Sequence, residues 1–179
     1  YMERYFDGDT FTYEEISAAL RSHVTDGEIV PVLMGSGINA QGAKMLLDCI
    51  VKYFPSPLNK PVYGKDLSNG EIVPVVYDSS KYMSAKVFKT LVDPFIGKYS
   101  FVNICTRSLK PDTMIYNVNK ETEEKLSKLY VLRGKEAIEV PELKAGDIGA
   151  VAKINNISTG DTIALKGAQV AYESPEISI

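Results

Sequence analysis

The stretch from residue 85 to residue 106 reads AKVFKTLVDPFIGKYSFVNICT, and it sets the character of most of the chain. Ala85–Asp93 and Tyr99–Thr106 are short segments rich in β-branched and aromatic residues, which predicts two strands. Asp93-Pro94 and Gly97 lie between them and predict a turn. The stretch therefore indicates β-structure with tight connections.

Further short strands are predicted on both sides of this stretch. They cover Ile72–Tyr77, Thr113–Asn117, Leu126–Leu132, Ala137–Val140, Ile148–Ile154 and Thr162–Leu165. About eight short strands separated by turn residues are typical of an antiparallel barrel or sandwich. The alternation along Ile148–Ile154, with alanine at 150 and 152, favours small side chains that point into a tight barrel.

Residues 1–57 follow a different pattern. Thr12 and Glu15 have the spacing of a capping box at the start of a helix. The apolar run Ile29–Met34 predicts a strand buried on both faces, as in a parallel sheet, and a helix is predicted from Gln41 to Phe54. Since one strand cannot form a sheet, this segment is interpreted as the edge of a doubly wound α/β domain whose other strands are missing.

The proline-rich stretch Pro55-Ser56-Pro57 and Pro61 predicts a stiff linker, with a domain boundary near Leu58. The predicted fold class is therefore α+β overall. Residues 1–57 form a partial α/β domain, and residues 58–179 form an all-β antiparallel barrel. The chain begins at Tyr1 and ends at Ile179, and we interpret it as a piece from the middle of a longer protein.

The composition excludes several classes of site. The single histidine, His23, and the widely spaced Cys49 and Cys105 do not provide a usual metal site or a C-x-x-C pair. No G-x-x-x-x-G-K-[ST] loop is present for a triphosphate. No apolar run approaches the roughly 20 residues of a membrane span, and no basic-then-apolar leader argues for secretion. We expect a cytoplasmic protein. We expect no complete catalytic site, metal or cofactor in this chain.

Charge is unevenly distributed along the chain. Residues 1–57 hold 4 Lys and Arg against 8 Asp and Glu. Residues 81–110 hold 6 basic residues against one acid, Asp93. This local excess predicts an anion-facing surface, and the alternative is a solvated face of the barrel.

The turn Gly35-Ser36-Gly37 follows the predicted strand Ile29–Met34. Open α/β sheets bind ligands at the carboxyl ends of their strands. Glycine lets backbone amides approach a flat base closely because no side chain intervenes. The turn is therefore a candidate ligand loop, and the alternative is an ordinary strand-to-helix connection.

Several motifs, in one collinear order, resemble those of bacterial elongation factor G. They are Ile29–Gly37, Asp93-Pro94-Phe95-Ile96-Gly97-Lys98, Leu109-Lys110, Ala145-Gly146-Asp147-Ile148 and Thr159-Gly160-Asp161-Thr162. One departure is Asp112, which stands where the family has a turn glycine. Because aspartate tolerates a left-handed backbone, the turn is expected to survive.

The resemblance implies a ribosomal translocase that hydrolyses GTP while moving tRNA and mRNA. Residues 1–57 would close its P-loop GTPase domain, and GTP and Mg²⁺ would be held by the parent protein. The barrel, of the translation-protein type, would pack on that domain and dock on small-subunit ribosomal RNA of the ribosome. The resemblance also assigns nucleotide base contacts to Ser36, Gly37 and Ile38, with a backbone amide near the base. The family usually has alanine where Gly37 stands.

The main hypothesis is a translation-factor fragment whose barrel contacts RNA phosphates. The candidate RNA contacts are Lys86, Lys89, Lys98, Arg107 and Lys110. A ribosomal protection protein or another translational GTPase is an alternative parent. A purely structural barrel without RNA contacts is a second alternative. An independent enzyme is disfavoured because no nucleophile–base pair is visible.

Overall fold

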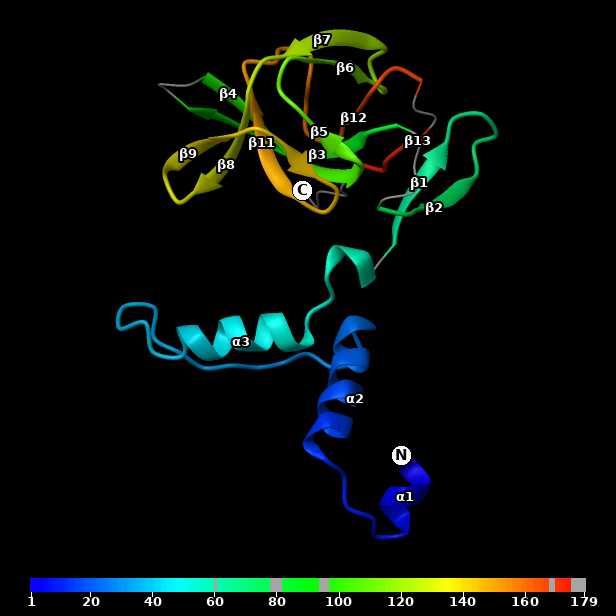
Figure 1. Ribbon diagram of the computed structural model, residues 1–179, viewed down its shortest axis with the longest axis vertical. Helices are drawn as coiled ribbons and strands as arrows, with labels where there is room; N and C mark the ends of the chain where they lie inside the picture. Colours follow the sequence, from blue (N-terminus) through cyan, green and yellow to red (C-terminus); the bar gives the residue numbers. More distant parts are fainter. Residues whose placement is uncertain (60, 78–81, 94–96, 168–169, 175–179) are drawn as a thin grey trace. The chain divides into compact units, whose positions relative to one another are not determined.

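The computed structural model describes residues 1–59, 61–77, 82–93, 97–167 and 170–174. The chain divides into two compact units, Tyr1–Asn59 and Lys60–Ile179, called unit 1 and unit 2 below (Figure 1). Unit 1 is helical, and the described part of unit 2 is built of strands. The candidate ligand loop therefore lies in unit 1, and the candidate RNA-binding residues lie in unit 2.

Unit 1 contains the α-helices α1 (Met2–Phe6), α2 (Tyr13–Thr25) and α3 (Ala43–Tyr53), and a 3-10 turn at Pro57–Asn59. The predicted capping box is confirmed at the start of α2. The Glu15 amide donates to Thr12 Oγ1 at 3.2 Å, and the Thr12 amide donates to Glu15 Oε2 at 2.8 Å. None of the described helices is both long enough and apolar enough to cross a membrane.

The predicted buried strand over Ile29–Met34 is wrong. The segment is extended but pairs with no other strand, and Val30, Val32 and Met34 are 78%, 88% and 89% exposed. A parallel strand needs at least one neighbouring strand to pair with, and unit 1 provides none. For the same reason the apolar face predicted for the helix after it is largely exposed, and Cys49 is the one buried residue of α3.

The described part of unit 2 contains three antiparallel sheets (Figure 1). The largest has eight strands in the order β7-β6-β12-β3-β4-β11-β8-β9, and it curls into a half-barrel. Its strands are β3 (Ser84–Asp93), β4 (Gly97–Thr106), β6 (Thr113–Asn117), β7 (Thr122–Leu126), β8 (Leu129–Arg133), β9 (Glu136–Val140), β11 (Ile148–Ala152) and β12 (Thr162–Ala164). The predicted antiparallel β-barrel is therefore confirmed.

Two smaller sheets flank the half-barrel. One pairs β5 (Ser108–Leu109) with β10 (Leu143–Lys144). The other, called the small sheet below, has the order β13-β1-β2 and consists of β1 (Val62–Asp66), β2 (Ile72–Val75) and β13 (Val170–Ala171). Its outer strand, β2, contains Pro74. The sequence did not predict β1, β5, β7, β10 or β13. Three of these strands have only two residues, β1 lacks a clear alternation, and β7 is rich in charged residues.

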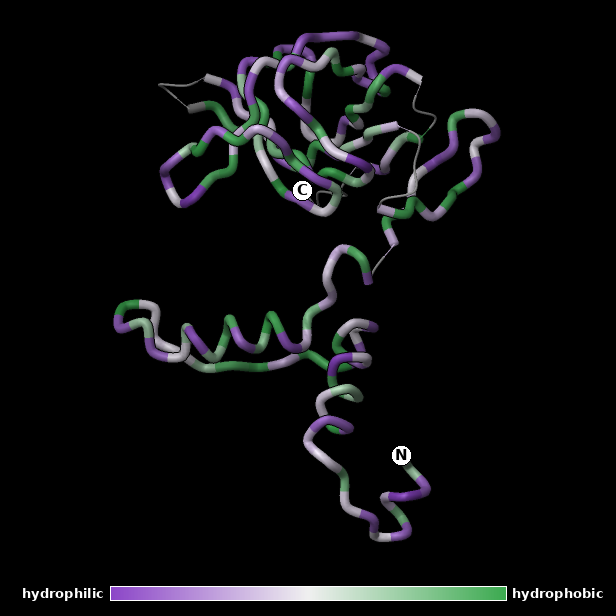
Figure 2. The backbone as a smooth tube through the Cα atoms, in the orientation of Figure 1, coloured by the Kyte–Doolittle hydropathy of each residue, from purple (hydrophilic) through white to green (hydrophobic). Residues whose placement is uncertain are grey.

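The core of unit 2 fills the concave side of the curled sheet. Its fully buried side chains come from β3, β4, β6, β7, β8, β11 and β12 and include Val87, Val102, Ile104, Ile115, Leu126, Leu129, Val151 and Ile163. Figure 2 shows both hydrophobic and hydrophilic stretches in the strands of unit 2, as sheets with one buried face require.

The predicted inward orientation of Ala150 and Ala152 is wrong. Val151 points into the core, whereas the two alanines lie on the opposite face with Tyr99. The Tyr99 and Tyr130 rings meet edge to face there, with centroids 5.9 Å apart. Small residues are needed on this outer face because the two rings pack against it.

The predicted strand Leu126–Leu132 corresponds to β8 and begins too early, because Leu126 is the last residue of β7. β7 ends at Leu126 and β8 begins at Leu129, and both leucines are fully buried. The exposed Ser127 and Lys128 between them connect the two strands.

At the departure from the family pattern, Asp112 has φ +57°, so the expected left-handed turn is confirmed. Of the motif 93–98, residues 94–96 lie outside the described residues.

Candidate functional site

The candidate ligand loop connects the extended segment to α3. Ser36 forms an isolated antiparallel bridge with Gln41, and the Ser36 amide donates to the Gln41 carbonyl at 2.9 Å. The Asn39 amide lies 3.4 Å from Ser36 Oγ. The loop is therefore a tight closed turn in which Ser36 Oγ is directed to the backbone.

Two glycines allow this turn to close. A methyl group on Gly35 would lie 2.7 Å from the Gln41 carbonyl oxygen, and one on Gly42 would lie 2.7 Å from the Met34 carbonyl oxygen. Gly42 also has φ +81°, a left-handed conformation that favours glycine. The loop geometry is thus set by Gly35 and Gly42, whereas Gly37 has open space around it.

Within the described part of the chain, the amides of Gly37 and Ile38 donate no backbone hydrogen bond, and the Ile38 side chain is almost fully exposed. A cavity of about 330 Å³ lies beside the loop, lined by Leu33, Ser36, Gly37 and Leu46 among others. Exposed amides at a small-residue turn can donate to a carbonyl oxygen on the edge of a flat ring. The described chain shows no group of acidic, histidine or cysteine side chains that could hold a metal ion.

The five predicted RNA-contact residues fall into three places in unit 2. Lys86 and Lys89 lie on β3. Ala85 and Val87 are fully buried, so the Lys86 side chain points away from the core. Lys89 follows a β-bulge and is exposed. These two lysines lie on the convex side of the sheet.

Lys98, at the start of β4, binds the protein itself. Its Nζ donates to the Ile157 carbonyl and lies 3.2 Å from the Asn155 carbonyl. Lys98 is therefore committed to holding the loop after β11, and a phosphate would have to compete with two carbonyl oxygens for its ammonium group.

Arg107 and Lys110 flank β5 on the surface. Arg107 is exposed and has φ +53°. The pairing of β5 with β10 places Lys144 opposite Ser108, so a third exposed cation joins this turn. Glu142 lies here too, with Oε1 3.8 Å from Lys110 Nζ. We call Arg107, Lys110 and Lys144 the basic turn.

The basic turn also affects Glu142. A hydrogen bond from Ser108, and then the charges of Lys110 and Lys144, lower the pKa of this carboxyl group. The sequence did not single out Lys144 because it is distant along the chain from Arg107. The pairing of the short strands β5 and β10 would have been the signal, and neither strand was predicted.

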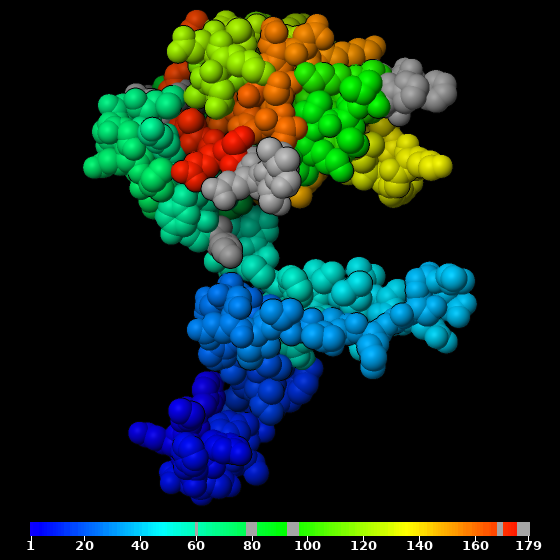
Figure 3. Space-filling model, turned by 180° about the vertical axis from the view of Figure 1, so that it is seen from behind, coloured from blue at the N-terminus to red at the C-terminus, as the bar shows by residue number. Residues whose placement is uncertain are grey.

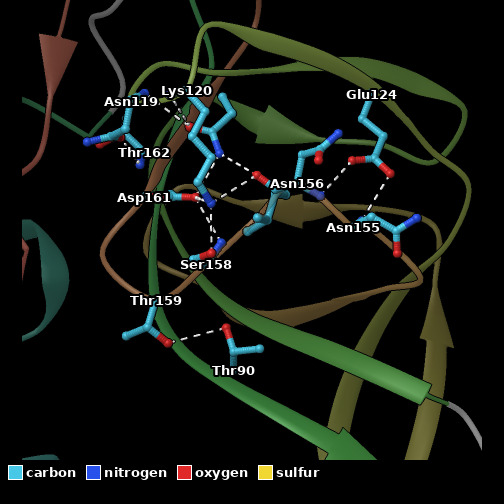
Figure 4. Close-up of polar contacts among 12 residues, drawn as sticks. Thr90, Asn119, Lys120, Glu124, Asn155, Asn156, Ser158, Thr159, Asp161 and Thr162 are labelled. Atoms are coloured by element: carbon cyan, nitrogen blue, oxygen red, sulfur yellow. Dashed lines mark hydrogen bonds and ion pairs between the residues drawn. The ribbon is translucent and has the colours of Figure 1, made fainter.

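The motif Thr159-Gly160-Asp161-Thr162 organises a polar network at one end of the half-barrel (Figure 4). Asp161 Oδ2 accepts from Asn117 Nδ2 at 2.7 Å and from the Ser158 amide at 2.8 Å, and it lies 2.8 Å from Lys120 Nζ. Burial raises the pKa of Asp161, but the hydrogen bonds from Lys120, Asn117 and Ser158 outweigh burial, and the net pKa is lowered.

Glu124 completes this network from β7. Its two carboxylate oxygens accept from the amides of Asn155 and Asn156 at 3.0 and 3.1 Å (Figure 4). Together with Lys98 and Lys120, Glu124 satisfies the backbone of the loop 153–161. The motif Thr159-Gly160-Asp161-Thr162 therefore has a structural role, which is to hold the loop 153–161 against the barrel.

Comparisons with known proteins agree with this architecture. Residues 82–166 match the family model for elongation factor G domain 2. The crystal structure of ttk003000868 from Thermus thermophilus is 28% identical in sequence, with a TM-score of 0.66. That match covers 98% of this chain and 23% of the Thermus chain, so the present chain spans about a quarter of that protein.

The curled barrel and its matched sequence make unit 2 a domain of a translational GTPase. Unit 2 carries a second domain of the elongation factor G type, matched over residues 82–166. This domain is a non-catalytic part of the GTPase.

Proposed function

We propose that this chain is part of a cytoplasmic ribosomal translocase, in which residues 1–57 close the GTP-binding domain and unit 2 docks on small-subunit ribosomal RNA. The parent protein would hold GTP and Mg²⁺ and hydrolyse the nucleotide. The observation that supports RNA docking is the basic turn, where Arg107, Lys110 and Lys144 are exposed around two short paired strands.

The basic turn suits phosphate binding better than sequence readout. Lysine and arginine side chains on surface turns neutralise phosphates, and such contacts position a protein without reading bases. Among the five original candidates, Arg107 and Lys110 are the strongest, Lys86 and Lys89 could extend the surface along β3, and Lys98 is the weakest because it binds two carbonyls.

The test uses the full-length protein and purified small ribosomal subunits. Arg107→Glu combined with Lys110→Glu is expected to weaken binding at least about tenfold and to make it less dependent on salt. Lys125→Glu is the matched control, because Lys125 is an exposed lysine of the same domain on β7, paired with the exposed Asp112. Equal affinities for the double variant and the control would refute RNA docking through the basic turn and favour a purely structural barrel.

The loop 35–42 would contribute base contacts through Ser36, Gly37 and Ile38. Its exposed amides support this assignment. In the full-length protein, Gly37→Ala is expected to keep nucleotide binding and to tighten it by up to a few fold, because alanine restricts the loop without removing an amide. A loss of nucleotide affinity in this variant would contradict the assignment.

A further inference from the structure

The small sheet brings together two segments that are far apart in the sequence. β1 is the first strand after unit 1, and β13 is the last strand of the described chain. They pair antiparallel, with Lys65 opposite Ala171 and Asp66 opposite Val170. In Figure 3 the red atoms of the β13 region lie beside the teal atoms of β1 and β2. The first and last described strands of unit 2 are thus joined by one short ladder.

Tyr172, the residue after β13, fastens this ladder to the large sheet. It is 3% exposed, and its amide donates to Thr162 Oγ1 of β12 at 2.8 Å. Its phenol oxygen lies 2.7 Å from Ser84 Oγ of β3, and Ser84 Oγ lies 2.7 Å from Thr106 Oγ1 of β4. One side chain therefore contacts β3 and, through a single serine, β4.

The hydroxyl protons in this row can be assigned by elimination. Thr106 Oγ1 lies 2.9 Å from the Tyr82 carbonyl, which can only accept, so Thr106 donates to it. Ser84 must then donate to Thr106, and Tyr172 must donate to Ser84. Each hydroxyl has one proton, so the row runs in one direction from the phenol to the backbone carbonyl. Consistent with a donor role, burial raises the pKa of Tyr172.

Close packing beneath the Tyr172 ring depends on Gly64 of β1. A methyl group at this position would lie 2.3 Å from Val170 Cγ1 and 3.3 Å from Tyr172 Cε1. Tyr172 and Val75 also form an apolar cluster with Cys105, which is 1% exposed. Cys105 comes from β4, so its thiol is covered only while the small sheet stays in place.

We propose that Tyr172 is a clasp, whose release frees the small sheet as one unit while the eight-stranded sheet stays folded. The hydroxyls of Tyr172, Ser84 and Thr106 are buried. Breaking the hydrogen bond between Tyr172 and Ser84 leaves buried polar groups without partners, which is costly. We therefore expect two states, one with this hydrogen bond formed and one with the small sheet released. Because β1 and β13 pair with each other, opening frees the first and last described strands of unit 2 together. The clasp is a conformational device that does not depend on RNA docking.

The experiment measures the reactivity of the Cys105 thiol in the 179-residue chain. Cys49→Ser removes the other cysteine. In this background, Tyr172→Phe is expected to raise the rate of modification by Ellman's reagent about tenfold, the effect of losing one buried hydrogen bond on an opening equilibrium. Tyr63→Phe is the matched control, since Tyr63 lies on β1 of the same sheet but is 58% exposed, and it is expected to leave the rate unchanged.

Hydrogen exchange locates the segment that opens. In Tyr172→Phe, amides of residues 62–66 and 170–172 are expected to lose protection, and amides of residues 99–104 on β4 are expected to keep it. Ser84→Ala removes the acceptor of the phenol and is expected to act in the same direction, which provides a second variant if the first folds poorly. An unchanged thiol rate in both variants, or equal loss of protection on β4, would overturn the clasp.

Discussion

Lys120 Nζ lies 2.8 Å from Asp161 Oδ2, and this ion pair ties the turn after β6 to the turn before β12 (Figure 4). Asp161 is 7% exposed as a residue, and the same oxygen accepts from Asn117 and from the Ser158 amide. The carboxylate is thus the common acceptor for three donors from different parts of the chain.

The first prediction concerns the stability of unit 2. Asp161→Asn is expected to lower the free energy of unfolding by about 2 kcal/mol, because hydrogen bonds to a charged, nearly buried group are lost. Urea unfolding followed by circular dichroism measures the change. Asp112→Asn is the control, since Asp112 pairs with Lys125 on the surface and its loss is expected to change stability by less than about 0.5 kcal/mol. Equal effects of the two substitutions would contradict an anchoring role for Asp161.

The second prediction concerns pH. The pKa of Asp161 is lowered in the folded protein, so the unfolded chain binds a proton at this group more readily than the folded chain. Its contribution to stability is therefore complete above the ordinary carboxyl pKa of about 4 and is lost as the pH falls through the lower folded value. The difference in unfolding free energy between wild type and Asp161→Asn is expected to be constant from about pH 6 to pH 7 and to shrink below about pH 4. A difference that grows on acidification would refute this assignment.

The third prediction separates two lysines that sequence reasoning had grouped together. Lys98→Met is expected to destabilise unit 2 by about 1–2 kcal/mol, because the Asn155 and Ile157 carbonyls lose a charged donor. Lys89→Met, on the exposed part of β3, is expected to change stability by less than about 0.5 kcal/mol. Thermal unfolding of the two variants provides the comparison. If Lys98→Met were as stable as Lys89→Met, Lys98 would no longer be the weakest of the candidate RNA contacts.

The fourth prediction concerns close packing at β11. A methyl group on Gly149 would lie 2.3 and 2.7 Å from the two Cδ atoms of Leu143 and 3.0 Å from the Tyr130 carbonyl oxygen. Leu143 is 1% exposed and belongs to the core, and the Tyr130 oxygen is a backbone atom. Gly149→Ala is therefore expected to cost about 1–3 kcal/mol in denaturant unfolding. Gly37→Ala, which places its methyl group in open space, is the control expected to leave stability nearly unchanged.

Local signals along the sequence predicted the elements whose stability is local. The capping box of Thr12 and Glu15 needs only residues three positions apart, and the structure confirms it. The left-handed turn at Asp112 follows from the preference of one residue type. The strand expected at Ile29–Met34 failed for the opposite reason, since a buried parallel strand exists only when neighbouring strands cover it.

The candidate sites depended more heavily on long-range contacts. The charges of Lys98 and Arg107 were visible in the sequence, but the binding of Lys98 to the loop 153–161 was not. Lys144 joined the basic turn through a two-residue ladder too short to predict. The row from Tyr172 to Ser84 joins residues 88 positions apart, so no local pattern could indicate it.

Pro74 has a consequence for how copies of this domain behave at high concentration. It lies in β2, whose far side carries no strand within the described part of the chain. An uncovered strand edge is a template on which a second polypeptide can add by backbone pairing. Proline has no N–H to offer, which interrupts the row of donors that an incoming strand would need. Replacing Pro74 by a residue with an N–H would restore that donor. The edge of β2 could then pair with a strand of a second copy, which favours fibrous assembly.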